Sequence, residues 1–233
     1  MSYNARVNLL AVETSTELCS VALLRGADLF VEEELAGNRH SEVLVPMLQR
    51  ALARARLAPR EMDAFGFGQG PGSFTGIRIA CGIVQGLAFA AERPVVPVPS
   101  LLALAEQTNE GRVVAALDAR MGEAYLAAYA RNGPDWDEVI APRLVDPASG
   151  LPPLPGRQWA ATGSGFDRHE WLREGYRRPV EMRYEGDLPR ASAVARVGAR
   201  LFLRGGAVAA ERAAPLYLRD KVAMTTEERQ AKA

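Results

Sequence analysis

Residues 9–24 read LLAVETSTELCSVALL, and residues 113–129 read VVAALDARMGEAYLAAY. Each stretch contains an apolar strand, an acidic residue at the end of that strand, a polar turn and a second strand. The acidic residues are Glu13 and Asp118, which stand 105 positions apart. Two weakly similar halves indicate an internal duplication. Two unrelated hairpins are the alternative, because short strands of this kind are common.

The sequence around the first copy alternates between strand and helix patterns. Expected strands cover 8–12, 19–24, 29–33, 64–68 and 95–98, and expected helices cover 41–56, with Ser41 as its cap, and 74–90. The second copy continues with a strand at 138–141, a proline-rich loop at 147–155, a strand from 159 and a helix at 192–203. We therefore predict an α/β protein with two mixed sheets flanked by helices. Its two subdomains are expected to be residues 1–99, joined by 208–233, and residues 100–207.

Composition excludes several classes of protein. The chain has 233 residues, 48% of them hydrophobic, which is enough for a sizeable core. Its 28 basic and 28 acidic residues give no net charge, so no basic field favours direct binding of nucleic acid. The apolar run 7–12 ends at Glu13, too short for a signal peptide or a membrane span. With two unpaired cysteines in apolar stretches, these features predict a cytoplasmic protein with reduced, buried thiols.

The glycine-rich segment 66–76 runs from the end of a strand into the start of a helix. Glycines allow close approach of the backbone, and a helix start offers free N–H groups to an anion, so a phosphate site is one interpretation. The segment lacks the lysine of a P-loop, and Arg78 comes one turn later. The other interpretation is a tight turn in which Ser73 caps the helix.

The helix expected at 74–90 has two apolar sides. One side, with Gly76, Ala80, Ile83, Val84 and Leu87, suits its own sheet. The opposite side carries Phe74, Arg78, Cys81, Gly82, Gln85 and Phe89, a composition that favours close packing against a partner. The preceding helix adds Val43, Met47, Arg50 and Arg54 beside its core stripe. An amphipathic helix buried within the monomer is the alternative.

Residues for catalysis are sparse. The histidines, His40 and His169, form no HxxxH or HExxH pair, so a helical two-histidine metal site is excluded and we expect no bound metal. His40 is expected to cap or pack at a helix start. Glu13 and Asp118 sit where phosphotransferases place magnesium-binding carboxylates, although acids in polar turns also serve as hydrogen-bonded turn residues.

Six stretches carry a resemblance to a known family. They are LAVETSTELCSVALL from Leu10, RHSEVLVPMLQRAL from Arg39, GQGPGSFTGIRIACGIVQGLAFA from Gly68, VPSLLALA from Val98, ALDARMGEAYLAAY from Ala116 and APLYLRD from Ala214. Together they resemble the TsaB/YeaZ-type dimerisation subunit of the bacterial machinery that makes threonylcarbamoyladenosine on tRNA. The resemblance covers most of 7–130, and the segment 143–210 matches only loosely.

This resemblance implies a duplicated ribonuclease-H-like, or actin-like ATPase, fold and a catalytic sister subunit, TsaD. The sister carries a metal-binding HxxxH pair, whereas this chain has Ser100 and Leu104 at the matching positions. The family usually has Asp where this chain has Glu13. The resemblance therefore implies a non-catalytic scaffold that dimerises with TsaD, meets the small ATPase TsaE through the complex and contacts tRNA only indirectly.

These considerations lead to two sets of site residues. The expected partner interface comprises His40, Val43, Met47, Arg50, Phe74, Arg78, Cys81, Gly82, Gln85 and Phe89. A vestigial nucleotide site is expected at Glu13, Ser15, Gly70, Gly72, Ser73 and Asp118. We expect no tightly bound cofactor, with ATP or ADP conceivable at the interface of the complex, and a homodimer when the chain is isolated. An ATP-dependent kinase of the actin-like superfamily is the alternative function.

Overall fold

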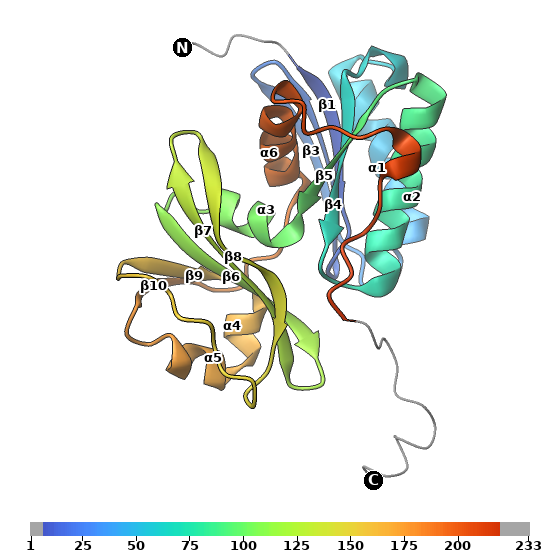
Figure 1. Ribbon diagram of the computed structural model, residues 1–233. Helices are drawn as coiled ribbons and strands as arrows, with labels where there is room; N and C mark the ends of the chain where they lie inside the picture. The colour runs from blue at the N-terminus through green and yellow to red at the C-terminus, as the bar shows by residue number, and fades with distance from the viewer. Residues whose placement is uncertain (1–6, 220–233) are drawn as a thin grey trace, which may run out of the picture.

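The computed structural model describes residues 7–219, which form two lobes (Figure 1). The first lobe contains β1 (Asn8–Glu13), β2 (Leu18–Arg25), β3 (Asp28–Leu35), α1 (His40–Ala55), η1 (Pro59–Glu61), β4 (Ala64–Gly70), α2 (Phe74–Ala91) and β5 (Val95–Pro99). α3 (Ser100–Gln107) leads to the second lobe, which contains β6 (Arg112–Arg120), β7 (Glu123–Asn132), β8 (Asp135–Val145), β9 (Trp159–Thr162), α4 (Ser164–Arg168), α5 (Glu170–Gly175) and β10 (Val180–Tyr184). α6 (Ala191–Leu203) and η2 (Ala210–Arg212) follow.

The two sheets have the same topology, which confirms the duplication. The first sheet has the order β3-β2-β1-β4-β5 and the second has β8-β7-β6-β9-β10. In both, the first three strands are antiparallel and the last two run parallel to the central strand. Strand order and direction therefore match position by position, as a ribonuclease-H-like fold that occurs twice requires.

The central strand of the first lobe is covered on both faces. Successive side chains of a strand point to opposite faces, so Leu10 and Val12 pack under α1 and α2 while Leu9 and Ala11 pack under α6. All four side chains are fully buried. This explains why the segment is continuously apolar instead of alternating.

The second lobe is covered less completely. Residues 146–158 connect β8 to β9 without helix or strand, as the proline-rich pattern predicted, whereas α1 occupies the corresponding connection of the first lobe. The short helices α4 and α5 stand where the first lobe has the single long helix α2. Phe166, Leu172 and Tyr176 from this helical segment pack with Trp159 of β9 and with apolar residues of β6 and β7 to form the core.

The helix that closes each half packs against the sheet of the other half. α3 buries Leu101 and Leu104 against β6 and β7 of the second lobe. α6 buries Val194 and Val197 in the core of the first lobe, against β1 and β5. α6, which falls within the expected subdomain 100–207, thus packs in the core of the first lobe.

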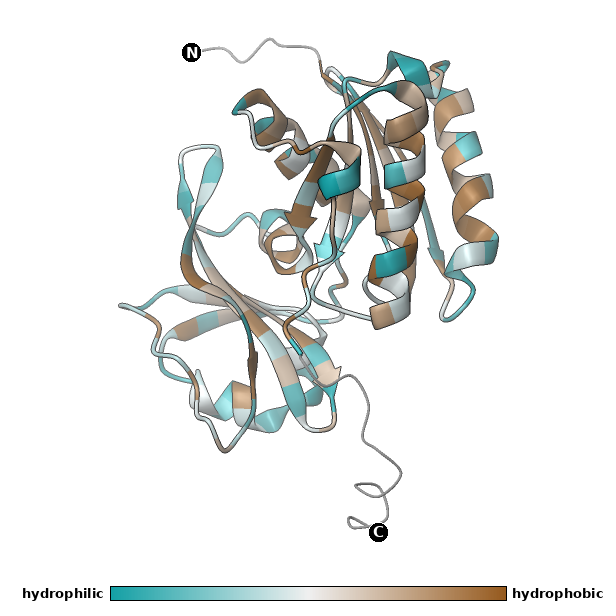
Figure 2. Cartoon of the chain, turned by 45° about the vertical axis from the view of Figure 1, so that its right-hand side comes forward, coloured by the Kyte–Doolittle hydropathy of each residue, from teal (hydrophilic) through white to brown (hydrophobic). Residues whose placement is uncertain are grey.

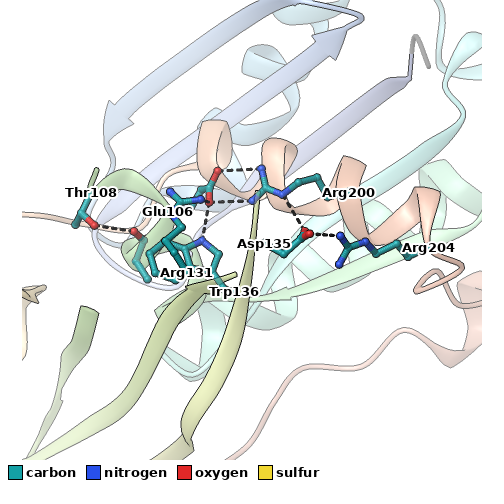
Figure 3. Close-up of polar contacts among 8 residues, drawn as sticks. Glu106, Thr108, Arg131, Asp135, Trp136, Arg200 and Arg204 are labelled. Atoms are coloured by element: carbon teal, nitrogen blue, oxygen red, sulfur yellow. Dashed lines mark hydrogen bonds and ion pairs between the residues drawn. The ribbon is translucent and has the colours of Figure 1, made fainter. Parts of the chain in front are cut away.

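A group of ion pairs holds the lobes together near α3 and α6 (Figure 3). Glu106 of α3 accepts hydrogen bonds from Trp136 Nε1 at 2.7 Å, from Arg131 at 3.2 Å and from Arg200 of α6 at 3.0 Å. Asp135, in the β7–β8 hairpin, pairs with Arg200 and with Arg204. A largely buried carboxylate with three donors is well compensated, so this group fixes the position of α6 between the lobes.

Interlobe cleft and outer helical surface

The glycine-rich turn between β4 and α2 packs tightly against the turn that follows β1. A Cβ atom on Gly72 would lie 2.4 Å from the carbonyl oxygen of Ser15, and one on Gly76 would lie 1.9 Å from that of Thr14. Ser73 donates its backbone N–H to the Ser15 carbonyl at 2.7 Å. These contacts explain the glycines by close approach of two backbone segments. Ser73 caps α2, as predicted, since its side chain accepts a hydrogen bond from the Gly76 N–H.

Glu13 lies inside the protein. Its carboxylate accepts hydrogen bonds from the Ser15 N–H at 2.6 Å and from the Ser100 hydroxyl at 2.8 Å. Gly68 faces it so closely that a Cβ there would lie 1.8 Å from Glu13 Oε2. Burial raises the pKa of Glu13, and the hydrogen bonds from Ser15 and Ser100 oppose that shift. Glu13 does not line the cleft between the two lobes, which is described below. A nucleotide bound in that cleft would therefore not reach Glu13, although this residue was predicted for a nucleotide site.

Asp118, the counterpart of Glu13 in the second lobe, faces the cleft. Its side chain is 19% exposed and pairs with His169 Nε2 at 3.0 Å. Arg168 Nε lies 3.7 Å from Asp118 Oδ2, and the Arg120 N–H donates to Asp118 Oδ1, the oxygen that contacts His169, at 2.9 Å. Sequence reasoning missed this pair because Asp118 and His169 are 51 positions apart, and only the packing of α4 beside β6 brings them together.

The cleft between the lobes has a volume of about 650 Å³. Its walls contain Ser15, Gly72, Ser73 and Thr75 from the first lobe, Asp118, Arg120, Ser164 and Arg168 from the second, and Leu216, Tyr217, Leu218 and Arg219 from the end of the described chain. It thus brings together four of the six residues predicted for a nucleotide site. Gly70 does not line the cleft: a Cβ atom there would lie 3.2 Å from the Ile77 side chain and 3.3 Å from the Leu216 carbonyl oxygen. Within residues 7–219, no three His, Cys, Asp or Glu side chains gather as a metal site.

α1 and α2 cover one face of the first sheet and form the outer side of that lobe (Figures 1 and 2). α2 has mean hydropathy 1.5 and is the one helix among the described residues that is long and apolar enough to span a membrane, although it packs on the sheet as a core helix. Figure 2 shows apolar positions on the exposed sides of both helices. We call Ile79, Gly82, Ile83, Gly86 and Phe89 the α2 outer stripe.

Gly82, Gly86 and Phe89 of the α2 outer stripe are left uncovered by the described part of the chain. Phe89 is 79% exposed, and a Cβ atom on Gly82 or Gly86 would meet nothing within 4 Å. Ile79 and Ile83 are partly exposed. The core side of α2 differs from the predicted one. Ile83 and Leu87, which were expected in the core, are only half-buried, whereas Ile77 and Cys81 are buried.

Several residues expected at the partner interface are buried instead. α1 begins at His40, one residue before Ser41, which was predicted as its cap. The His40 side chain points inward, and its Nε2 lies 2.8 Å from the Thr16 carbonyl oxygen. Burial lowers the pKa of His40. Met47 is fully buried in the core beneath α1. His40, Met47 and Cys81 are therefore buried within the single chain, where their side chains are not presented at the surface.

The remaining expected residues are accessible to different degrees. Val43 is partly buried, and Arg50 is exposed but pairs with Glu32 of β3 at 2.8 Å. Phe74, Arg78, Gly82 and Phe89 are exposed on α2.

The C-terminal strap, which we define as residues 208–219, covers one flank of α2. Gln85 Nε2 donates to the carbonyl oxygens of Ala210 and Ala213 at 3.1 and 2.9 Å, and Cys81 Sγ lies 3.6 Å from the Ala213 carbonyl. The sequence pattern did not predict this contact. It shows that α2 has two apolar sides, but it cannot show which of them a distant segment of the same chain covers. Both cysteines are free and buried, as predicted, and burial raises the pKa of Cys19 to about 12.

The strap also connects the lobes. It pairs with β5 at Val208, and its Leu216 N–H donates to the Gln69 carbonyl at 2.7 Å. Leu218 then packs in the core of the second lobe, and Arg219 pairs with Glu123 of β7. Figure 1 shows this segment passing from the side of α2 toward the second lobe.

Comparisons with known proteins agree on one family. Residues 31–227 match the family model described as TsaD: tRNA N6-adenosine threonylcarbamoyltransferase. The tRNA threonylcarbamoyladenosine biosynthesis protein TsaB of Escherichia coli is 36% identical over 93% of this chain and 96% of its own length. TsaB of Haemophilus influenzae is 35% identical, with 93% and 95% covered.

A solved structure agrees with the sequence comparison. YeaZ from Pseudomonas aeruginosa superposes with a TM-score of 0.81 and 36% identity, over 91% of this chain and all of that one. The extent of these matches, together with the repeated ribonuclease-H-like topology, confirms the expected resemblance. The chain belongs to the TsaB/YeaZ family of tRNA threonylcarbamoyladenosine biosynthesis proteins, within the group described by the TsaD family model.

Proposed function

We propose that this chain is a non-catalytic scaffold subunit that docks on the catalytic sister TsaD and supports threonylcarbamoyl transfer to the tRNA adenosine next to the anticodon. The observation that carries this proposal is the uncovered α2 outer stripe. An exposed apolar strip with small residues at its centre favours close approach of a partner helix. α1, which covers the same face of the sheet, also has an exposed apolar side chain, Val45, at 43%.

The absence of catalytic machinery in the first lobe supports a scaffold role. Ser100 and Leu104 occupy the positions expected for the metal-binding histidines of TsaD, and both are fully buried. Glu13 is enclosed by Gly68 and Ser100. A carboxylate without access to the cleft is unsuited to bind a magnesium–nucleotide complex.

The partners follow from this role. TsaD is proposed to bind the α2 outer stripe directly, and the isolated chain is proposed to form a homodimer through the same surface, because either association covers the apolar strip. TsaE is proposed to meet this chain through the complex. With zero net charge, the chain is proposed to contact tRNA only indirectly and to work in the cytoplasm.

Reconstituted threonylcarbamoyl transfer tests the proposal. TsaD and TsaE, supplied with tRNA, ATP and an activated threonylcarbamoyl donor, would be assayed for modified tRNA with the wild-type chain, with a Gly82→Arg chain and with no added chain. We expect modification only with the wild-type chain, since the arginine at Gly82 projects from the centre of the outer stripe. Equal modification in all three reactions would refute a supporting role.

A second candidate function is nucleotide binding, as in an ATP-dependent kinase, and the interlobe cleft favours it. The cleft has room for a nucleotide and presents Asp118 and Ser73. Magnesium-dependent ATP turnover by the pure chain that disappears in Asp118→Ala would support this candidate. ATP or ADP bound only when TsaD is present would instead indicate a nucleotide at the interface of the complex.

A further inference from the structure

Arg78 is held between two aromatic rings on the outer side of α2. Its Cζ atom lies 3.6 Å from the centroid of the Phe74 ring and 5.4 Å from that of Tyr217. Its Nε donates a hydrogen bond to the Tyr217 hydroxyl at 2.7 Å. Phe74 is 38% exposed and Tyr217 is 46% exposed, so the cluster is open to a partner.

The Arg78 guanidinium has donors that remain unused within residues 7–219. Only its Nε makes a hydrogen bond there, and no carboxylate in this range pairs with it. By contrast, Arg50 and Arg54 of α1 both pair with Glu32, and Arg219 pairs with Glu123. The terminal nitrogens of Arg78 can therefore donate to an anion that comes from outside.

The strap makes this arrangement rigid before any partner binds. Leu216, beside Tyr217, is fixed by its hydrogen bond to Gln69, and Ala213 is fixed by Gln85. Less rotamer freedom is then lost on association, because both rings already hold the side chain. Arg and Tyr are also the residue types that most often dominate the energy of an interface.

The position of the cluster matches the proposed docking surface. Arg78 and Gly82 are four residues apart on α2, so they lie on the same side of the helix, one turn from each other. Phe74 and Tyr217 also lie at the mouth of the interlobe cleft. The α2 outer stripe thus continues from its apolar centre into a cationic end.

We propose that Arg78, positioned by Phe74 and Tyr217, anchors a carboxylate side chain of the docked catalytic subunit by donating two hydrogen bonds to it. A planar guanidinium matches a carboxylate in this bidentate manner, and partial shielding by the rings strengthens the pairing. A guanidinium can pair with a carboxylate or a phosphate, but Glu17 and Asp118 line the adjoining cleft and repel a multiply charged phosphate more than a singly charged carboxylate. This inference rests on the proposed scaffold function.

Isothermal titration calorimetry of the full-length chain with TsaD from the same organism measures the Kd of the complex and tests the anchor. We expect Arg78→Gln to raise the Kd at least about tenfold, as loss of a charged anchor at an interface does. Arg78→Lys should recover little affinity, because an ammonium cannot donate in the bidentate geometry. Arg93→Gln, two residues beyond the end of α2, is the control and should leave the Kd unchanged.

The identity of the anion is tested by a double-mutant cycle. An Asp→Asn or Glu→Gln variant of TsaD should exist whose loss of affinity is not additive with that of Arg78→Gln. An acid of this chain outside the described residues, Asp220, is the control for an anion from the same chain, and Asp220→Asn should leave the Kd unchanged. If Asp220→Asn reproduces the effect of Arg78→Gln, or if Arg78→Gln weakens Mg·ATP binding to the isolated chain and spares TsaD, the anchor is assigned to the wrong anion.

Gly82→Arg separates this inference from the proposed function. If Gly82→Arg abolishes TsaD binding while folded Arg78→Gln and Tyr217→Ala variants bind as the wild type does, the anchor is refuted and the scaffold function stands. If Gly82→Arg binds TsaD normally, the proposed docking surface fails and the anchor fails with it. Circular dichroism of each variant confirms that it is folded.

Discussion

The two lobes share one strand order but differ in what covers the outer face of the sheet. The first lobe has two long helices there, α1 and α2, of 16 and 18 residues. In the second lobe, a loop replaces the first helix and two short helices of 5 and 6 residues replace the second. The central strands β1 and β6 are nevertheless buried in both lobes, so long helices with an apolar exposed side are more than burial of the sheet centre requires.

The ends of the two central strands differ in a corresponding way. Glu13 is enclosed between Gly68 and Ser100, whereas Asp118 faces the interlobe cleft and pairs with His169. A duplicated fold places both acids at equivalent positions, and the neighbouring residues decide which one meets solvent. Of these two acids only Asp118 is open to the cleft, and the function proposed above makes the first lobe, with its long helices, the docking platform.

The largest effect is expected from separating the lobes. Residues 1–110 alone lack α6, whose apolar side chains complete the core beneath β1. We expect this fragment to show no cooperative thermal unfolding by circular dichroism, because a large apolar face stays exposed. Cooperative unfolding of the fragment would contradict the exchange of closing helices between the halves.

Glycine substitutions at the strand-to-helix turns come next and test whether the lobes are built alike. A Cβ at Gly76 would lie 1.9 Å from the Thr14 carbonyl oxygen, and one at Gly163 would lie 2.3 Å from that of Ala116. Alanine at either position should lower the free energy of unfolding by about 2–3 kcal/mol, since backbone must move to accept it. Urea denaturation measures both changes, and an effect confined to one lobe would break the equivalence of the turns.

Gly86→Ala is the matched control on α2. Its Cβ would enter open space, and alanine is favoured over glycine within a helix, so stability should rise by about 0.5–1 kcal/mol. Because the proposed homodimer would itself cover this side of α2, unfolding is measured at a protein concentration at which the chain is monomeric. A loss of stability there would mean that the fold of the single chain already covers Gly86.

A smaller, pH-dependent effect is expected at the two strand-end acids. Burial raises the pKa of Glu13, so its stabilising contribution is complete in acid and is lost as the pH rises through that raised pKa. Glu13→Gln should therefore unfold at a temperature roughly 2–6 °C higher than the wild type at pH 8. The difference should shrink as the pH falls toward 4.5, the ordinary pKa of a glutamate.

Asp118→Asn supplies the other half of this comparison. The substitution removes the ion pair with Arg168 and weakens the hydrogen bond with His169, so it should lower the unfolding temperature slightly at pH 7. Differential scanning calorimetry over the same pH series measures both variants. Stabilisation by Asp118→Asn and destabilisation by Glu13→Gln would reverse the assignment of the enclosed and open acids.

Much of the fold could be predicted from the sequence because the first lobe is locally consistent. Apolar spacing and the Ser73 cap locate α2 to within one residue, and α6 ends before Gly205 as predicted. Sequence patterns missed β10, whose short segment VEMRY is exposed at the edge of the second sheet and carries little periodicity. They also could not assign α6 to the first lobe, because helical spacing shows an apolar face without identifying the sheet that covers it.

The candidate site was predictable in part for the same reason. The pattern of α2 identifies Gly82 and Phe89 as members of an apolar side, and both are exposed. It cannot show that the strap covers Cys81 and Gln85, because that contact joins residues more than 120 positions apart. The Arg78 cluster depends on Tyr217 in the same way.

Gly82→Arg, examined by size-exclusion chromatography with light scattering and by capture of TsaD, tests the central claim most directly. Gly82 has no neighbour within 4 Å in the direction of a side chain, so the variant should keep the wild-type circular dichroism spectrum. A long cation at the point of closest helix approach prevents packing, and burying it unpaired is strongly unfavourable. We predict a folded monomer that no longer binds TsaD. A folded Gly82→Arg protein that still dimerises and still captures TsaD would contradict the assignment of the outer side of α2 as the docking surface.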